Sequence, residues 1–250
     1  GTSAAGLTIG MVKLSDGTMI AQAGVLPLCS GGFAFIDEFD KMKDEDRSAL
    51  HEVMEQQTAS IAKGGIVATL NARTSILAAA NPMYGKYDPF KNITENVNLP
   101  IPLLTRFDLI FVVRDKPSKE KDEKIAKHII DLHTPQGIDN RSLIDSETLT
   151  KYVSYAKRVD PILTKEAETK ILEYYLKMRN VETEDMITVT PRQLEGLIRL
   201  ATARARLLLK NKVEEEDAQR AIDLLQNMFE DAGIDVNTGK VDLGVLQGRP

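Results

Sequence analysis

Two adjacent carboxylates that follow a short apolar run are the residues best suited to chemistry. The run covers residues 33–36 (FAFI), and Asp37 and Glu38 come directly after it. We expect a strand buried on both faces of a parallel sheet, because the run is uninterrupted and wholly apolar. The acids then lie at the carboxyl edge of the sheet, where open α/β folds bind ligands. Because successive side chains of a strand point to opposite sides, the two acids can have different roles.

The chemistry predicted for this pair is hydrolysis of a nucleotide phosphate. Asp37 would hold a hydrated Mg²⁺ ion on the phosphates, and Glu38 would orient and polarise the attacking water. The alternative is a strand that ends in two solvated acids without any ligand.

Two further polar residues occupy comparable places. Asn81 follows the apolar run 75–80, and its amide could share the attacking water or contact the terminal phosphate; the alternative is an Asn-Pro turn. Arg106 stands just before the apolar run 109–113, which suits an arginine that stabilises charge in a neighbouring subunit's site. Its alternative is a surface pair with Asp108.

The elements that position these residues alternate between strands and helices. We expect strands at 33–36, 75–80 and 109–113, a helix at 44–57, and a hairpin formed by 58–62 and 66–70. Apolar strands that alternate with helices predict an α/β fold with a covered parallel sheet. Lys63 begins the glycine-rich turn of the hairpin, where it could probe a ligand or be a solvated turn lysine.

The second half of the chain is predicted to be helical, with a domain boundary that separates residues 1–115 from 116–250. Helices are expected at 119–133, 146–159, 165–179, from 191 onward and at 214–231. The helix that begins at Pro191 is the best marked, with Thr190 as its N-cap and Gln193 three residues later. A basic cluster is predicted to be a solvated helix face; it comprises Arg199, Arg204, Arg206, Lys210 and Lys212.

Composition excludes several classes of protein. With 32 basic and 37 acidic residues among 250, the net charge of −5 excludes a surface that coats nucleic acid, but not a small basic element that grips it. Cys29 is the single cysteine, so the chain has no internal disulfide and no cysteine-rich zinc site. No apolar run approaches the roughly 18 residues that span a bilayer, and no signal-peptide pattern opens the chain.

Several segments, in this order, resemble the minichromosome maintenance (MCM) replicative helicases, which are AAA+ ATPases. They are residues 31–42 (GGFAFIDEFDKM), 54–58 (MEQQT), 60–66 (SIAKGGI), 80–82 (ANP) and 105–110 (TRFDLI). The resemblance covers essentially the whole chain and is densest before residue 115. The archaeal, single-gene form of the family looks closest.

The resemblance implies a fold, an activity and partners. The fold would be an AAA+ parallel-sheet ATPase core, lacking its first strand and P-loop, followed by an all-helical lid. The activity would be ATP-driven unwinding of duplex DNA by a hexameric ring, with ATP and Mg²⁺ bound at subunit interfaces. Partners would be single-stranded or forked DNA, identical or other MCM subunits, and replication initiation factors, but no membrane. The location would be the cytoplasm or nucleoid in an archaeon and the nucleus in a eukaryote, and the protein would not be secreted.

The same resemblance assigns roles position by position. Asp37 and Glu38 match the Walker B acids, and Asn81 matches the sensor 1 amide. Arg106 matches the arginine finger, which acts on the neighbouring subunit's site. Gln56 and Arg192 match residues that act on that same site, Arg192 as sensor 2. Lys63 matches the DNA-contacting lysine of the presensor-1 hairpin, and residues 7–25 resemble the helix-2 insertion, a second channel loop.

One family motif does not occur in these 250 residues: the phosphate loop G-x-x-x-x-G-K-[ST]. The chain begins at Gly1 rather than Met, so we expect the loop to lie upstream, and we expect the 250 residues alone not to hydrolyse ATP. One alternative is a non-catalytic ring subunit that donates Arg106 and Gln56 to its neighbour. Another is an AAA+ transcription activator that remodels a polymerase, although the Lys63 hairpin favours the helicase.

Overall fold

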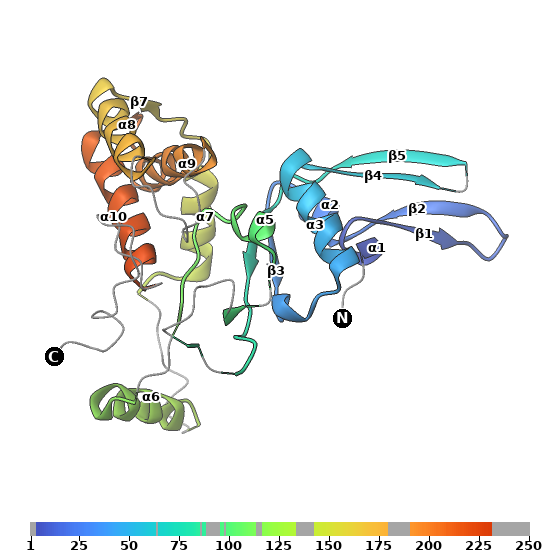
Figure 1. The fold of residues 1–250 in the computed structure, drawn as a ribbon, viewed down its shortest axis with the longest axis horizontal. Coiled ribbons are helices and arrows are strands. Elements are labelled where there is room, and N and C mark those ends of the chain that lie inside the picture. Colours follow the sequence, from blue (N-terminus) through green and yellow to red (C-terminus); the bar gives the residue numbers. More distant parts are fainter. Residues whose placement is uncertain are drawn as a thin grey trace. The chain divides into compact units, whose positions relative to one another are not determined.

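The computed structural model describes residues 4–63, 65–85, 87–88, 96–97, 99–113, 117–133, 143–179 and 191–231. The chain divides into two compact units, Gly1–Asp108 and Leu109–Pro250. In Figure 1 the first unit runs from blue to green and the second from green to red.

The first unit contains the predicted parallel strand pair. β3 (Phe33–Ile36) pairs in parallel with β6 (Ser75–Ala78), with Ile36 opposite Ala78. The backbone pairing extends one step further, because the Ala79 N–H donates to the Ile36 carbonyl at 2.8 Å. Both strands therefore end at the same edge, and the α/β prediction for this half of the chain is confirmed.

The burial of β3 differs from the prediction. Ala34 is buried, with 1% of its surface exposed, whereas Phe33 and Phe35 are 61% and 75% exposed. The two rings stack on each other, with centroids 6.3 Å apart. Alternate residues of a strand face opposite sides, and only the side that Ala34 faces is packed. The expectation of a strand buried on both faces is thus wrong for the described residues.

Two antiparallel hairpins lie side by side in this unit (Figure 1). β1 (Ile9–Lys13) pairs with β2 (Met19–Ala23), and β4 (Thr58–Lys63) pairs with β5 (Ile66–Asn71). The second hairpin is the predicted one, with Lys63 opposite Ile66 across the turn. The base of the first hairpin requires glycine at Gly24, because a Cβ there would lie 2.6 Å from backbone atoms of Leu7 and Thr8.

Helix α3 (Asp44–Gln56) follows the acid-ended strand and confirms the helix predicted for this segment. Its first turn is acidic, as the helix dipole favours, and its apolar face buries Leu50 and Val53. The shorter elements of the unit are α1 (Ala4–Leu7), α2 (Val25–Leu28), η1 (Phe39–Lys41) and α5 (Ile101–Leu104).

The second unit is built around three helices, as expected for a lid. Its helices are α6 (Lys119–Leu132), α7 (Ser146–Ala156), α8 (Lys165–Arg179), α9 (Pro191–Leu207) and α10 (Glu215–Asp231). Side chains of α8, α9 and α10 form its apolar core. Besides helices, the described part contains one short parallel pair, β7 (Ile162–Leu163) with β8 (Lys212–Val213).

The strand predicted at residues 109–113 is not formed. These residues have no regular secondary structure, so that prediction is wrong. Leu109 and Ile110 pack instead against the helical core of the second unit. The Ile110 N–H lies 3.1 Å from the Met228 sulfur. The prediction failed because a short apolar run can fill the core of a helical unit as well as form a buried strand.

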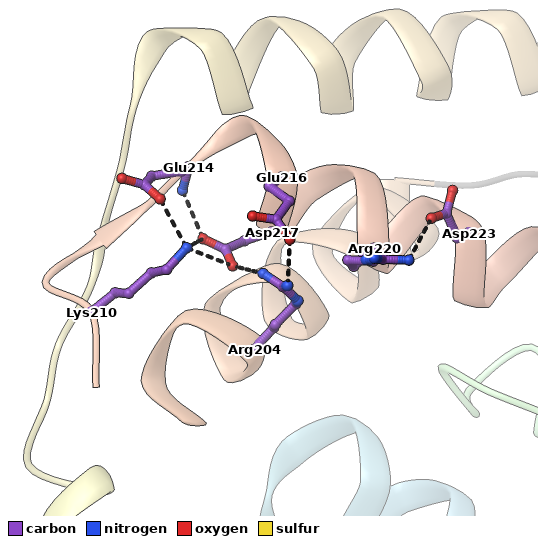
Figure 2. A network of polar contacts seen from close by, with 7 residues as sticks. All are labelled: Arg204, Lys210, Glu214, Glu216, Asp217, Arg220 and Asp223. Carbon is purple, nitrogen blue, oxygen red and sulfur yellow. Dashed lines mark hydrogen bonds and ion pairs between the residues drawn. The ribbon is translucent and has the colours of Figure 1, made fainter. Parts of the chain in front are cut away.

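A buried carboxylate connects α9 to α10 (Figure 2). Asp217 has no exposed surface, and it forms ion pairs with Arg204 and with Lys210, whose Nζ lies 3.3 Å from its Oδ2. The Glu214 N–H donates to Asp217 at 3.0 Å. Burial alone raises the pKa of Asp217, but the hydrogen bonds from Glu214, Arg204 and Lys210 together outweigh it and lower that pKa. Two members of the predicted solvated basic face are therefore committed to an internal network.

Candidate active site

The acid pair stands immediately beyond β3, and both side chains are exposed. The Glu38 N–H donates to Asp37 Oδ1 at 2.7 Å, which holds the first carboxylate against the backbone. Glu38 adopts a left-handed backbone with φ 52° and ψ 41°. For a residue other than glycine, this conformation costs on the order of 1 kcal/mol; Gln57, which caps α3, and Leu209 adopt it as well.

Lys41 is a neighbour of the acid pair that the sequence did not single out. Its Nζ forms an ion pair with Glu38 Oε1, three residues earlier, and both side chains are more than half exposed. The hydrogen bond to Glu38 and the charge of Glu38 raise the pKa of Lys41. A lysine three residues from an acid across a tight turn is the local signal that could have predicted the pair.

Asn81 reaches the same edge from β6. Its backbone N–H donates to Asp40 Oδ1 at 2.9 Å, and two residues earlier the Ala79 carbonyl accepts from the Phe39 N–H at 2.9 Å. These bonds connect the segment after β6 to the segment that begins with Asp37 and Glu38. The three residues predicted to act within one subunit are therefore brought together.

Arg106 contacts an acid that lies 51 positions earlier in the chain. Its Nη2 lies 2.8 Å from Glu55 Oε2, and its side chain is only 9% exposed. Its Nε and Nη1 are buried and have no hydrogen-bond partner in the described part of the chain. Such donors are costly to bury and are suited to an anion that would accept from them. No local pattern marks Glu55, because the contact depends on the fold.

The other predicted residues are distributed over both units. Gln56 is the last residue of α3, is exposed and follows the Glu55 that holds Arg106. Lys63 is exposed at the end of β4. Arg192 is the second residue of α9 in the other unit and is half-buried; the Thr190 predicted to cap this helix lies outside the described residues.

The ligand set fits a cation held through water rather than by a protein cage. No group of three or more His, Cys, Asp or Glu side chains able to hold a metal occurs in the part of the chain that the structure describes. Asp37 is exposed and keeps its second carboxylate oxygen free of the Glu38 contact, which suits a hydrated Mg²⁺ ion. None of the described helices is long and apolar enough to cross a membrane.

A parallel strand pair that ends in acids and an amide, followed by a helical unit, fits the ATPase core and lid of the AAA+ class. Comparison with known families agrees with this class: the MCM P-loop domain matches residues 1–133, and the MCM AAA-lid domain matches residues 147–229. The chain belongs to the minichromosome maintenance family, as its sequence motifs predicted.

Individual relatives cover between 90% and 100% of this chain. It is 46% identical over 256 residues to the minichromosome maintenance protein MCM of Saccharolobus solfataricus. That match covers 100% of this chain and 37% of the relative. It is 44% identical to the DNA replication licensing factor MCM4 of Arabidopsis thaliana, over 98% of this chain and 30% of the relative. The factor mcm7 of Xenopus tropicalis is 43% identical over 90% of this chain and 32% of its own length. The chain thus spans about a third of the length of these relatives.

Proposed function

We propose that this chain forms part of the motor of a replicative DNA helicase, which hydrolyses ATP at subunit interfaces of a hexameric ring and unwinds duplex DNA. The single observation that carries the proposal is the convergence of Asp37, Glu38 and Asn81 at the carboxyl edge of β3 and β6. Family membership and the relatives named as DNA replication licensing factors support the same activity.

Within one subunit, the chemistry rests on three side chains. Glu38 accepts a hydrogen bond from the attacking water and orients it toward the terminal phosphate of ATP. Asn81 donates to that water or to the phosphate, and both contacts require the amide to lie beside Glu38. Asp37 would hold the hydration shell of Mg²⁺, an ion that neutralises charge on the phosphates when bound.

The neighbouring subunit completes the site in this proposal. Arg106 acts as an arginine finger and stabilises the charge that develops on the transferred phosphate. Gln56 and Arg192 act from the same neighbouring subunit. The buried, unpartnered donors of Arg106 support its assignment to an anion. The 250 residues contain no G-x-x-x-x-G-K-[ST] loop, so on their own they supply only part of a nucleotide site.

DNA contact is assigned to the Lys63 hairpin. An exposed lysine at the end of a narrow β-ribbon can reach a phosphate, and six copies around a ring concentrate positive charge that a net charge of −5 per chain conceals. Contacts of this kind are independent of base sequence and weaken with salt. Partners in this proposal are forked or single-stranded DNA, further MCM subunits and replication initiation factors.

The test is strand displacement by the protein that carries this sequence. We expect ATP-dependent unwinding of a forked duplex by the unmodified protein and its loss in Glu38→Gln, with DNA binding retained. Glu52→Gln, the same change at an exposed position of α3, should leave unwinding intact. Unwinding that persists in Glu38→Gln would contradict the proposal. A protein that joins a ring without hydrolysing ATP would favour a non-catalytic subunit.

A further inference from the structure

The carboxylate of Asp40 bridges the two strand ends that form the candidate active site. Asp40 lies in η1 (Phe39–Lys41), directly after the acid pair, and is half-buried. Its Oδ1 accepts the backbone N–H of Asn81 at 2.9 Å, across 41 positions of sequence. This carboxylate therefore links the segment after β3 to the segment after β6, beside the backbone bond from the Phe39 N–H to the Ala79 carbonyl.

Asp40 is itself held firmly. Its backbone carbonyl accepts from Nη2 of Arg47 at 2.6 Å, and the Arg47 side chain is only 9% exposed on α3. The preceding residue, Phe39, is 1% exposed and donates its N–H to the Ala79 carbonyl at 2.9 Å. Phe39 also packs edge-on against Phe107, with ring centroids 5.7 Å apart. Because this turn is well anchored, the Asp40 carboxylate can hold the Asn81 backbone in place.

Asn81 needs such an anchor because the sheet does not reach it. β6 ends at Ala78, and the last bond along the strand pair is that from the Ala79 N–H to the Ile36 carbonyl. Pro82, which follows Asn81, has no N–H to donate. The Phe39 N–H holds the Ala79 carbonyl, and the bond to Asp40 adds a restraint at Asn81 itself, the residue whose amide must lie beside Glu38.

We propose that Asp40 is a positioning residue for ATP hydrolysis. It holds the Asn81 backbone so that the Asn81 amide and the Glu38 carboxylate can both hydrogen-bond to the attacking water. This inference rests on the function proposed above. The role depends on a hydrogen-bond acceptor at Oδ1 rather than on charge, because the partner is a neutral backbone N–H. Misplacement of a reacting group by about 1 Å can cost on the order of 100-fold in rate.

Three variants of the complete, assembled protein test the role of the acceptor in steady-state ATPase assays. Asp40→Ala removes the acceptor and should lower kcat about tenfold, which corresponds to the loss of one positioning hydrogen bond. Asp40→Asn keeps an acceptor oxygen and should stay within about twofold of the unmodified rate. Asp44→Ala removes a 97% exposed carboxylate that also faces Arg47 but does not touch Asn81, and it should leave kcat within about twofold.

A double-mutant comparison separates positioning from general structural support. If Asp40 acts through Asn81, the variant that combines Asp40→Ala with Asn81→Ala should be no slower than Asn81→Ala alone. Further slowing in that background, or an Asp40→Ala defect that Asp40→Asn does not rescue, would overturn the inference. Full activity of Asp40→Ala beside an inactive Asn81→Ala would also overturn it, while leaving the proposed function intact. Full activity of Asn81→Ala would instead overturn the proposed function.

Discussion

The two units use their charged residues in opposite ways. In the second unit, Asp217 is completely buried and satisfied by Arg204, Lys210 and a backbone N–H (Figure 2). In the first unit, Asp37 and Glu38 are exposed at the end of a strand, and Glu38 holds a left-handed backbone. The buried charge of Asp217 is thus enclosed by its partners, whereas Asp37 and Glu38, the latter paired with the exposed Lys41, remain open to a ligand.

Two arginines make the same contrast. Arg204 lies between two carboxylates, those of Asp217 and Glu216, and its charge is fully engaged. Arg106 is more deeply buried, has Glu55 as its acid partner and keeps two nitrogens without a partner among the described residues. A buried donor left without an acceptor costs about 1–3 kcal/mol, a cost that Arg106 shares with Arg47, His51 and Tyr174 among the described residues. The environment of Arg106 agrees with the role in anion binding that we propose for it.

Substitution of Glu38 by glycine should produce the largest change. The ATPase rate should fall about 1,000-fold, because the residue that orients the water is lost. The free energy of unfolding should not fall, since glycine adopts the left-handed conformation without steric cost. Parallel ATPase and thermal-denaturation measurements check both expectations. A variant that is destabilised as much as it is inactivated would assign Glu38 to the fold instead.

Substitution of Asp217 by alanine should show the opposite behaviour and rank second. It leaves Arg204 and Lys210 beside a vacated buried site, and the lid should lose about 3 kcal/mol of unfolding free energy. Denaturant unfolding of the protein, followed in the lid, measures this loss. Glu147→Ala, which breaks the exposed pair with Lys151, is the matched control and should cost less than about 0.5 kcal/mol. Equal effects of the two substitutions would remove the distinction between the buried network and the surface.

Lys63→Ala should have a smaller effect that is confined to DNA. We expect affinity for single-stranded DNA to fall about tenfold at low salt and to depend less steeply on salt concentration, because phosphate contacts are lost. ATP hydrolysis without DNA should be unchanged. Lys151→Ala, an exposed helical lysine, serves as the control in the same titrations. A loss of affinity that is the same at every salt concentration would argue against phosphate contact.

Acid should weaken the second unit gradually through Asp217. Its pKa is lowered below the ordinary value of 3.8, so its contribution is fully present above that value and is lost as the pH falls through the folded-state pKa. The slope from one such group is at most about 1.4 kcal/mol per pH unit. As the pH is lowered from about 5 to about 3, the free energy of unfolding should fall more steeply for the unmodified protein than for Asp217→Asn. Identical slopes would show that Asp217 does not titrate in this way.

The sequence predicted local features better than long-range ones. The strand before Asp37, the hairpin at Lys63 and the helix at Pro191 were all predictable, because each is marked by its own residues and turn or cap signals. Family membership was predictable for the same reason, since its motifs are contiguous.

The remaining features depend on residues that only the fold brings together. The contact of Arg106 with Glu55 spans 51 positions and that of Asn81 with Asp40 spans 41, and neither has a local signature. Composition alone could not separate Arg204, which pairs with a buried acid, from a solvated helix face. The apolar run at 109–113 was misassigned because such a run fits a sheet and a helical core equally well.

The most direct test of the central claim mixes two inactive variants. Glu38→Gln lacks the residue that acts on its own subunit's nucleotide, and Arg106→Ala lacks the residue that acts on the neighbour's. If each ATP site is shared, a mixed ring contains interfaces with an intact Glu38 on one side and an intact Arg106 on the other. We predict that ATPase activity reappears on mixing and is greatest near equal proportions. No recovery, in mixtures shown to exchange subunits, would contradict a site shared between neighbours.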